Sequence, residues 1–497
     1  MSLERILAFP RSSSRAGATA VTILLGLPAA LVAWGFWGFS HDDAFITYRY
    51  ADQWAHGNGL TFNTGEHVLG TSAAGYALLL GLLSRTAGFA GLDVPAWGTI
   101  LSLAAILLIS WLLATGLASA PEPYRWGVPL VFGIGALLWR WNLQMLGSEA
   151  LPVVALAAAG AYFVFEKEEP VLGGLALAGA MILRLDAGLA AAAIGIVLWF
   201  SIERFPWKFA VAGLAPLALW LAGLWSRFGT WIPATLAGKR AEYSEATAAY
   251  SLAEWDWLRR SLPLSGCLVL LGLAILGAGV CAKRGLWKHP AVLALTLWLV
   301  SQEIAYRAIR VPFAPWYHEG LANAVLILAV FGAVTLGDGL LSWRRSGEGR
   351  LTPALLGCLI LLPVLAPSAA SIWEQWGRPP DARLEIYRMI GLYLREHARP
   401  QSTVVAVEVG IIGYFSNRTI LDLQGLVTPE VIRAKSEGRL VQLLKASKAD
   451  VIVDMPDFRV NALAFLSNPA ISSSYRVAHE FPPMAGFAGC RLLERVP

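Results

Sequence analysis

Long apolar runs recur along the chain up to about residue 372, and most are long enough for a helix that crosses a bilayer, which needs roughly 20 mostly apolar residues. The first run covers residues 18 to 39 and follows arginines at positions 5, 11 and 15. It is too long, and too poor in a small-residue cleavage site, for a cleaved signal peptide. We therefore expect a membrane anchor that begins in the cytoplasm.

Short basic stretches separate the later apolar runs and predict their orientation. Cytoplasmic loops carry the excess of lysine and arginine, so each basic stretch is expected inside, with two spans between one and the next. Together with one span at each end, the pattern predicts about eleven membrane-spanning helices and an extracytoplasmic C-terminus. Residues 171 to 200 are short for two spans and predict a recessed hairpin. The basic residues are Arg125, Lys167, Arg204, Lys208, Lys283, Arg284, Lys288, Arg344, Arg345 and Arg350.

Residues 73 to 92 are apolar as well, but we do not expect them to cross the membrane. If they did, every later basic loop would lie outside, against the positive-inside rule. Ser84, Arg85 and Thr86 also interrupt the run, which is typical of a helix at the membrane surface. The whole stretch 40–93 is therefore predicted to be the first extracytoplasmic loop.

After residue 372 the pattern changes to short segments with ordinary charge density. Residues 403–407, 419–423 and 450–453 predict β-strands, and residues 384–397 and 440–447 predict helices. The chain thus divides into a helical membrane domain, residues 1–372, and a small α/β domain, residues 373–497, of a common domain size. The α/β domain is expected outside, at the end of the last span.

Composition supports this reading and excludes other classes. Hydrophobic residues make up 56% of the chain and charged residues 15%, whereas soluble domains carry charge on about a quarter of their residues. A soluble enzyme and a disordered chain are excluded. The net charge of +5 is spread thinly, so no nucleic-acid partner is expected. Four cysteines form no disulfide framework, and without a CxxC or HExxH motif a zinc site has no support. We predict no cofactor and assign no metal ligand, and assistance by a divalent metal stays open.

The first predicted span is followed directly by two adjacent acids, Asp42 and Asp43. A carboxylate at the start of a helix often caps its free N–H groups. Neighbouring side chains on a helix point about 100° apart, so only one acid is expected to cap while the other can face a cavity.

Other charged residues interrupt the apolar runs at their predicted outer ends. Glu149 lies between two spans, and Arg184 and Asp186 interrupt the hairpin. Ionisable groups at membrane depth are costly and usually face a cavity or a partner. Glu149 can equally be a polar turn residue, and Arg184 with Asp186 can form a structural ion pair.

Two outer stretches, 227–240 and 306–319, mix cations with aromatic residues, glycine and proline. Outer cations run against the orientation bias and suggest a bound anion such as phosphate, although solvated loop charges fit as well. The candidate ligands there are Arg227, Lys239, Arg310, Tyr317 and His318. An acid, a group of cations and the membrane together favour one chemistry. A carboxylate takes the proton from an acceptor hydroxyl while cations stabilise the departing phosphate of a lipid-linked sugar.

These residues also carry a family resemblance. The stretch DDAFITYRYADQWAHGNGLTFNTGEHVLGTSAAGY, residues 42–76, resembles the first extracytoplasmic loop of the GT-C class of membrane glycosyltransferases, particularly the cell-wall arabinofuranosyltransferase-like branch. Supporting segments follow in order: GSEA at 147, RLDAG at 184, RFGTWIPATLAGK at 227, APWYHEG at 314 and GYFSNRTILDLQGLVTPEV at 413. More distantly, the chain is similar to lipid A aminoarabinose transferases and protein mannosyltransferases, whose two-acid motif aligns with Asp42 and Asp43.

The resemblance implies a polyprenyl-phosphate-sugar donor, inversion at the anomeric carbon and Asp42 as the base. Asp43 and Glu149 are expected to orient the acceptor or tune that base. Donor-phosphate or substrate binding is assigned to Arg184, Asp186, Arg227, Lys239, Arg310, Tyr317 and His318. The acceptor is a glycan, lipid or protein of the cell envelope, at the outer face of a prokaryotic cytoplasmic membrane. Two alternatives remain: a transporter or flippase for lipid-linked sugars, and a membrane-anchored binding protein.

Overall fold

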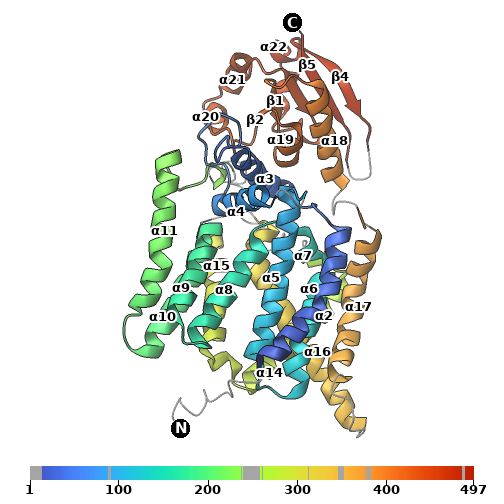
Figure 1. Ribbon diagram of the computed structural model, residues 1–497. Helices are drawn as coiled ribbons and strands as arrows, with labels where there is room; N and C mark the ends of the chain where they lie inside the picture. Colours follow the sequence, from blue (N-terminus) through green and yellow to red (C-terminus); the bar gives the residue numbers. More distant parts are fainter. Residues whose placement is uncertain are drawn as a thin grey trace.

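A computed structural model describes residues 14–87, 91–236, 238, 258–259, 261–309, 311, 313–344, 352–374, 376–377, 382–483 and 487–496. Lys239 and Arg310 therefore lie outside the described residues. The molecule has a helical bundle at one end and an α/β domain at the other, with two short helices between them (Figure 1).

The described part of the bundle contains eleven helices, in agreement with the predicted number. Six of them are long and apolar enough to cross a membrane, judged by length and composition. The hairpin α9–α10 is short as predicted, with helices of 14 and 15 residues. The bundle helices are α2 (Ser14–Gly35), α5 (Val94–Gly116), α6 (Glu122–Leu138), α8 (Ala150–Phe165), α9 (Pro170–Leu183), α10 (Gly188–Ile202), α11 (Trp207–Phe228), α14 (Leu264–Lys283), α15 (Pro290–Ala308), α16 (Glu319–Arg344) and α17 (Thr352–Glu374).

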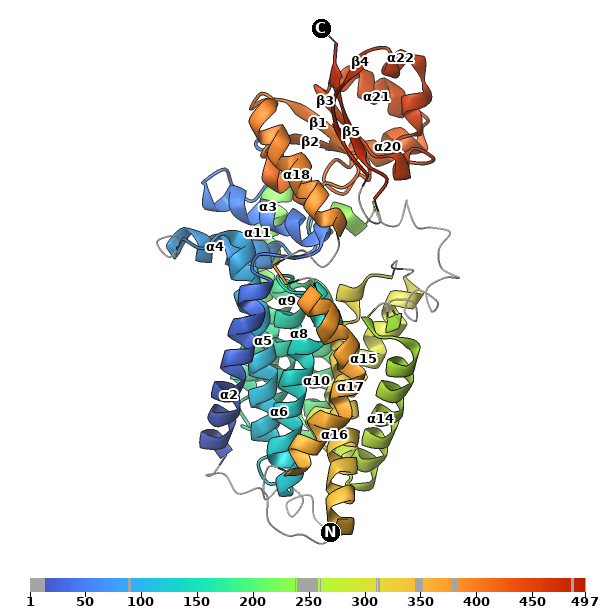
Figure 2. The same ribbon diagram turned by 90° about the vertical axis from the view of Figure 1, so that its right-hand side faces the viewer.

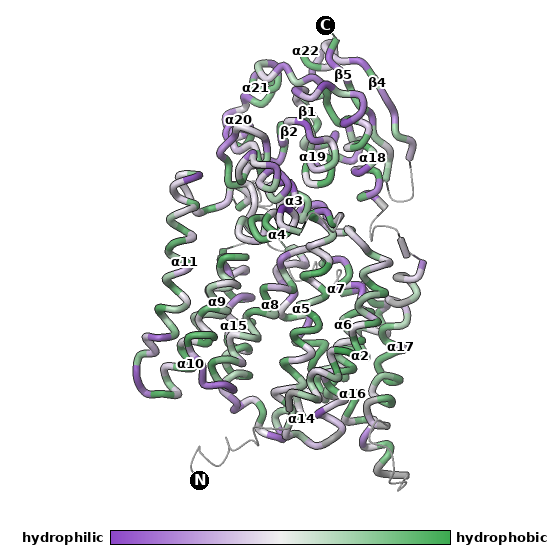
Figure 3. The backbone as a smooth tube through the Cα atoms, viewed as in Figure 1, coloured by the Kyte–Doolittle hydropathy of each residue, from purple (hydrophilic) through white to green (hydrophobic). Residues whose placement is uncertain are grey.

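The outer faces of these helices are apolar, which is the pattern of a bundle that has lipid as its solvent. Phe200 and Leu219, for example, are each 78% exposed. Hydrophobic residues, drawn in green, run along the bundle helices, whereas the α10–α11 connection, at the end away from the α/β domain, is hydrophilic (Figure 3). The chain is therefore a multi-pass membrane protein.

The helices alternate in direction, so their connections fall at two ends of the bundle. Lys167, Arg204 and Lys288 lie in the connections α8–α9, α10–α11 and α14–α15, at the end away from the α/β domain. The opposite end carries Glu149, at the start of α8, and Arg184, at the end of α9. These three predicted basic loops thus share one end of the bundle, whereas Arg345 and Arg350 of the last predicted loop lie outside the described residues.

Helices α3 (Asp42–Ala55) and α4 (Ala74–Thr86) lie between the bundle and the α/β domain in both ribbon views (Figures 1 and 2). Helix α4 thus belongs to the layer above the bundle rather than to the set of bundle helices, as its interrupted apolar run predicts. A short helix, α7 (Arg140–Gln144), joins α6 to the turn before α8.

The C-terminal domain is a five-stranded sheet, ordered β2-β1-β3-β5-β4, with helices packed around it. Strands β1, β2 and β3 are parallel, and β5 and β4 add to β3 in antiparallel fashion. The three predicted strands and two predicted helices are all present. The elements are α18 (Ala382–His397), β1 (Thr403–Ala406), α19 (Gly410–Ser416), β2 (Thr419–Asp422), α20 (Glu430–Ser436), α21 (Leu440–Ser447), β3 (Val451–Asp454), α22 (Pro469–Ser472), β4 (Tyr475–Phe481) and β5 (Cys490–Arg495).

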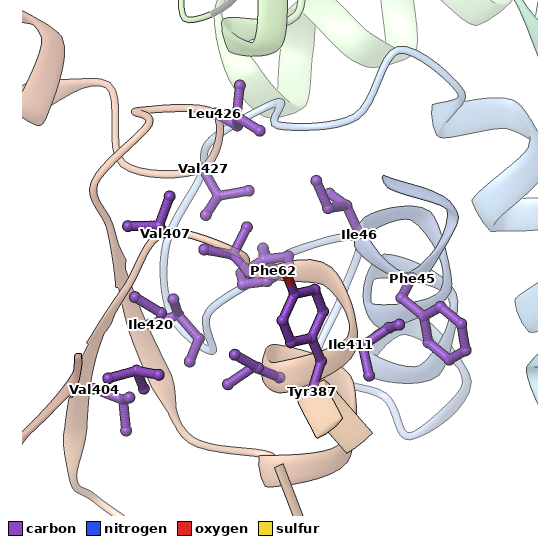
Figure 4. Packing of buried hydrophobic residues seen from close by; sticks show 14 of the residues in the cluster. Phe45, Ile46, Phe62, Tyr387, Val404, Val407, Ile411, Ile420, Leu426 and Val427 are labelled. Atoms are coloured by element: carbon purple, nitrogen blue, oxygen red, sulfur yellow. The ribbon is translucent and has the colours of Figure 1, made fainter. Parts of the chain in front are cut away.

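One hydrophobic core joins the first loop to the C-terminal domain. Phe45, Ile46 and Phe62 of the loop pack in the same cluster as Ile411 and Ile420 of the domain (Figure 4). The bundle has separate clusters of its own, one built around helices α5, α6, α16 and α17 and another between α8, α10 and α15. The first loop is therefore held from above by the C-terminal domain, and its helix α3 begins directly over the bundle end.

Candidate functional site

The beginning of α3 meets the outer ends of α9 and α15 at a cavity of about 220 Å³. Acids, a cation and aromatic rings from distant parts of the sequence line it together. The charged and aromatic residues of the wall are His41, Asp43, Glu149, Arg184, Asp186, Tyr306, Trp316 and Tyr317. Five predicted site residues, Asp43, Glu149, Arg184, Asp186 and Tyr317, are thus brought to one cavity.

A tight turn positions Glu149 at this cavity. Gly147 in the GSEA segment has a φ of +86°, a conformation that favours glycine. A Cβ atom at this position would overlap the hydroxyl of Tyr48 on α3, so the turn packs directly against that helix. The Gly147 carbonyl also accepts a hydrogen bond from the hydroxyl of Tyr76 on α4 (3.0 Å). Both loop helices therefore hold the turn that carries Glu149.

The two adjacent acids have different surroundings. Asp42 accepts hydrogen bonds at Oδ2 from the Gly410 N–H (3.0 Å) and at Oδ1 from the Ile411 N–H (2.8 Å), so it caps helix α19 of the C-terminal domain. Asp43 lines the cavity beside Arg184 and Glu149, whereas Asp42 does not line that cavity. One acid caps and the other faces a cavity, as expected, but the capped helix belongs to another domain.

Burial changes the acidity of Asp42. Removal from solvent raises its pKa to about 7, the neighbouring Asp43 charge adds to the rise, and the two N–H bonds from α19 oppose it. The Asp42 carboxyl thus holds its proton far more strongly than a free aspartic acid.

Arg184 is the centre of the polar network under the cavity, and only 5% of it is exposed. Its guanidinium donates to both Asp186 oxygens, to the Trp316 carbonyl (2.8 Å) and to the Tyr306 hydroxyl (3.1 Å). Its Nη1 also lies 3.6 Å from Oε1 of Glu149. The predicted ion pair with Asp186 exists and extends to a second carboxylate, so Arg184 ties α9, α15 and the start of α8 together.

An aromatic pair stands beside Asp43. The rings of His41 and Trp316 stack with centroids 4.5 Å apart and planes 7° from parallel. Both rings line the first cavity and also a second one, of about 290 Å³, on which Asp42 and Asp43 also border. The stack therefore separates the two cavities, and Asp43 lines both of them.

Not every predicted site residue reaches a cavity. Arg227 is exposed at the end of α11, beside Gly59 of the first loop, and is not among the lining residues. His318 is buried, with its Nδ1 2.7 Å from Oε1 of Glu303 and its ring stacked on Phe313. Lys239 and Arg310 lie outside the described residues, although Leu236, Ile309 and Val311, close to them in sequence, line the first cavity.

Sequence reasoning did not assign His41, Tyr306 and Trp316 to the site. Tyr306 and Trp316 belong to the outer stretch 306–319 that the sequence singled out, and His41 directly precedes the acid pair. Aromatic residues at span ends are common in the interfacial belt of membrane proteins, so their type alone does not indicate a site. Among the described residues, no group of three or more histidine, cysteine, aspartate or glutamate side chains could hold a metal ion.

Comparison with solved structures identifies the fold. ArnT from Cupriavidus metallidurans in the apo state matches 97% of this chain and 99% of its own, with a TM-score of 0.59 and 12% identity. The same protein bound to undecaprenyl phosphate gives a TM-score of 0.55 at 12% identity over 96% and 98% of the two chains. The Archaeoglobus fulgidus oligosaccharyltransferase, tethered to an acceptor peptide, matches 97% of this chain and 74% of its own, with a TM-score of 0.52 and 11% identity.

Sequence comparison adds one family. Residues 377–494 match a domain of unknown function, DUF8728, which covers the C-terminal domain. No curated protein matches the chain. The bundle, the loop helices and the outer domain together have the fold of the GT-C class, as the sequence resemblance predicted.

Proposed function

We propose that the protein is a membrane glycosyltransferase that moves a sugar from a polyprenyl-phosphate carrier to a hydroxyl of a cell-envelope acceptor. The observation that carries this proposal is the cavity at the bundle end, where Asp43, Glu149 and Arg184 meet under the first loop. The fold supports it, because one neighbour was solved with undecaprenyl phosphate and another with dolichol phosphate and an inhibitory peptide.

In this proposal Asp43, rather than Asp42, is the base. Asp43 borders both cavities and shares the first with the Arg184 network, whereas both oxygens of Asp42 accept N–H groups of α19. A base must reach the proton that it removes, and its carboxylate must be ionised. Asp42 instead positions its neighbour by joining α3 to the C-terminal domain.

The reaction is a single displacement. Asp43 takes the proton of the acceptor hydroxyl, the acceptor oxygen bonds to the anomeric carbon, and the bond from that carbon to the phosphate oxygen breaks. The polyprenyl phosphate leaves with the bonding electrons, and the anomeric configuration inverts. Lys239 and Arg310 remain the proposed phosphate ligands, because cations stabilise the charge that develops on the leaving group. Arg184 and Asp186 support the cavity wall, and Tyr317 lies under the Arg184 guanidinium.

The proposed orientation places the C-terminal domain and both cavities outside the cytoplasmic membrane, and the basic loops inside. The common end of Lys167, Arg204 and Lys288 supports it, because cytoplasmic loops are enriched in such residues. The transporter alternative is less well supported, since the cavity charges gather at one end of the bundle rather than along a path through it.

The test compares purified wild type, Asp43→Asn and Asp42→Asn with labelled short-chain polyprenyl-phosphate sugars and a cell-envelope acceptor fraction. Loss of a catalytic base typically costs about 10²–10⁴-fold in rate, and we expect that loss in Asp43→Asn. Asp42→Asn should retain transfer at a reduced rate. Normal transfer by Asp43→Asn together with an inactive Asp42→Asn would return the base to Asp42. Donor movement across vesicles without release of polyprenyl phosphate would favour the transporter.

A further inference from the structure

A second cavity, of about 290 Å³, lies on the other side of the His41–Trp316 stack. The bundle side contributes Gln144 and Phe313, and the C-terminal domain contributes Arg383 and Tyr387 of α18 together with Glu408. The cavity is therefore formed where the outer domain meets the bundle. Its volume is close to the roughly 300 Å³ at the lower end of ligand sites, which suits one sugar unit.

The chemistry of the two cavities differs. The first cavity has apolar residues such as Leu236, Ile309 and Val311 beside its charged wall, at the ends of the membrane helices. The second presents a carboxylate, a guanidinium and an amide, with aromatic rings next to them. Hydroxyl groups both donate and accept hydrogen bonds, so they can bond to all three of these groups, and the apolar faces of a sugar can pack on the rings.

Among the described residues, the two cavities have three lining residues in common, namely His41, Asp43 and Trp316. In an inverting displacement the nucleophile approaches the anomeric carbon from the face opposite the leaving group. The two cavities lie on opposite sides of the His41–Trp316 stack and share the Asp43 carboxylate, so this arrangement satisfies the requirement.

Building on the proposed function, we propose that the second cavity is the acceptor site. It takes a sugar unit of a glycan or glycolipid and presents one of its hydroxyls to Asp43, while the donor headgroup occupies the first cavity. Arg383 and Glu408 determine which acceptor fits, since they reach the cavity from the C-terminal domain. The outer domain is thereby the part of the protein that selects the acceptor.

The experiment measures how label from a short-chain polyprenyl-phosphate sugar partitions between an acceptor and water. The acceptor probes are octyl glycosides of hexoses and pentoses and, separately, a glycan and glycolipid extract of cell envelopes. Glu408→Gln and Arg383→Ala should lower the ratio of transfer to hydrolysis about tenfold, through a higher KM for the acceptor, because each removes a charged hydrogen-bonding group.

Two controls separate this effect from general damage. Glu396→Gln alters an exposed acid on α18, the helix that carries Arg383, away from the cavity lining, and should leave the ratio of transfer to hydrolysis unchanged. Tyr306→Phe alters the first cavity and should lower transfer and hydrolysis together, so the ratio stays constant. An unchanged ratio in both Glu408→Gln and Arg383→Ala, with an active wild type, overturns the acceptor site alone. A wild type that releases no polyprenyl phosphate overturns the proposed function and the acceptor site with it.

Discussion

Asp42 and Asp43 are neighbours in sequence, yet their carboxylates contact different parts of the molecule. The Asp42 carboxylate bonds to N–H groups that lie 368 and 369 residues further along the chain, and Asp43 lines the cavity with Arg184. Both acids sit in the first turn of α3, where the helix dipole favours negative charge. Two adjacent residues therefore have different roles: Asp42 connects the first loop to the C-terminal domain, and Asp43 is the candidate base.

The raised pKa of Asp42 predicts that docking of the C-terminal domain depends on pH. The pKa is about 7 in the folded protein, against 3.8 for an unperturbed group, so the folded state binds the proton more strongly. This contribution to stability is complete below pH 3.8 and is lost as the pH rises through about 7. The buried Asp422, with a pKa raised to about 6, acts in the same direction.

We therefore expect faster hydrogen exchange in α19 at pH 8 than at pH 5, after correction for the intrinsic exchange rate. Asp42→Asn should reduce this difference, because it removes the larger of the two shifts, and Asp422 should account for the remainder. Each unit of pKa shift is equivalent to about 1.4 kcal/mol, so the change in protection should be easy to measure. An undiminished pH dependence in Asp42→Asn would contradict the assignment to this carboxyl.

At the scale of elements, the junction of α3 with α19 holds the site from above. Arg49 of α3 donates to the carbonyls of Phe62 (3.0 Å) and Gly413 (2.9 Å) and to Oδ1 of Asn417 (2.8 Å). Asn63 pairs in both directions with the backbone of Ile420, at 2.9 Å each. Buried polar groups that are fully bonded fix one arrangement of the two parts, because any other leaves them unpaired.

A substitution at Gly410 tests whether the close approach of α19 to α3 is necessary. A Cβ atom at Gly410 would overlap the carbonyl of Asp42, so Gly410→Ala should push α19 away from α3 and cost about 1–3 kcal/mol of stability. Thermal unfolding and sugar transfer should both be impaired. Gly223→Ala is the matched control, because no atom lies within 4 Å of a Cβ there. Equal behaviour of the two variants would show that the close approach is unimportant.

Local patterns were sufficient for most elements but not for the site. Apolar runs and basic loops predicted the bundle because hydropathy and charge act within each segment. Strands β4 and β5 were not predicted from the sequence, and in β4 most residues are exposed, which weakens the alternation. Arg227 was expected at the site from its neighbours in sequence, but helix α11 ends beside the first loop, away from the cavity. Which acid faces the cavity depends on α19, a contact that no local pattern contains.

At the scale of the whole molecule, the core clusters of the described residues do not coincide with the two predicted domains. The first loop lies within residues 1–372, yet its apolar residues belong to the core of the C-terminal domain. Val153 of α8 and Met181 of α9, at the outer end of the bundle, join the same cluster, while the other bundle clusters are separate. The division between cores therefore runs through the outer end of the bundle, below the first loop, and both cavities lie where the loop meets that end.

This division predicts which parts unfold together. Phe62 is 2% exposed and packs between α3 and strand β2, and Phe132 is fully buried in the bundle core. Replacing a buried phenylalanine with alanine costs about 3–5 kcal/mol, so both variants should be destabilised to a similar extent. Phe62→Ala should raise hydrogen exchange in α3 and in β1 and β2 together, whereas Phe132→Ala should leave that set protected. If Phe62→Ala loosened α3 alone, the loop would be an independent layer, and the C-terminal domain would lose its structural connection to Asp43.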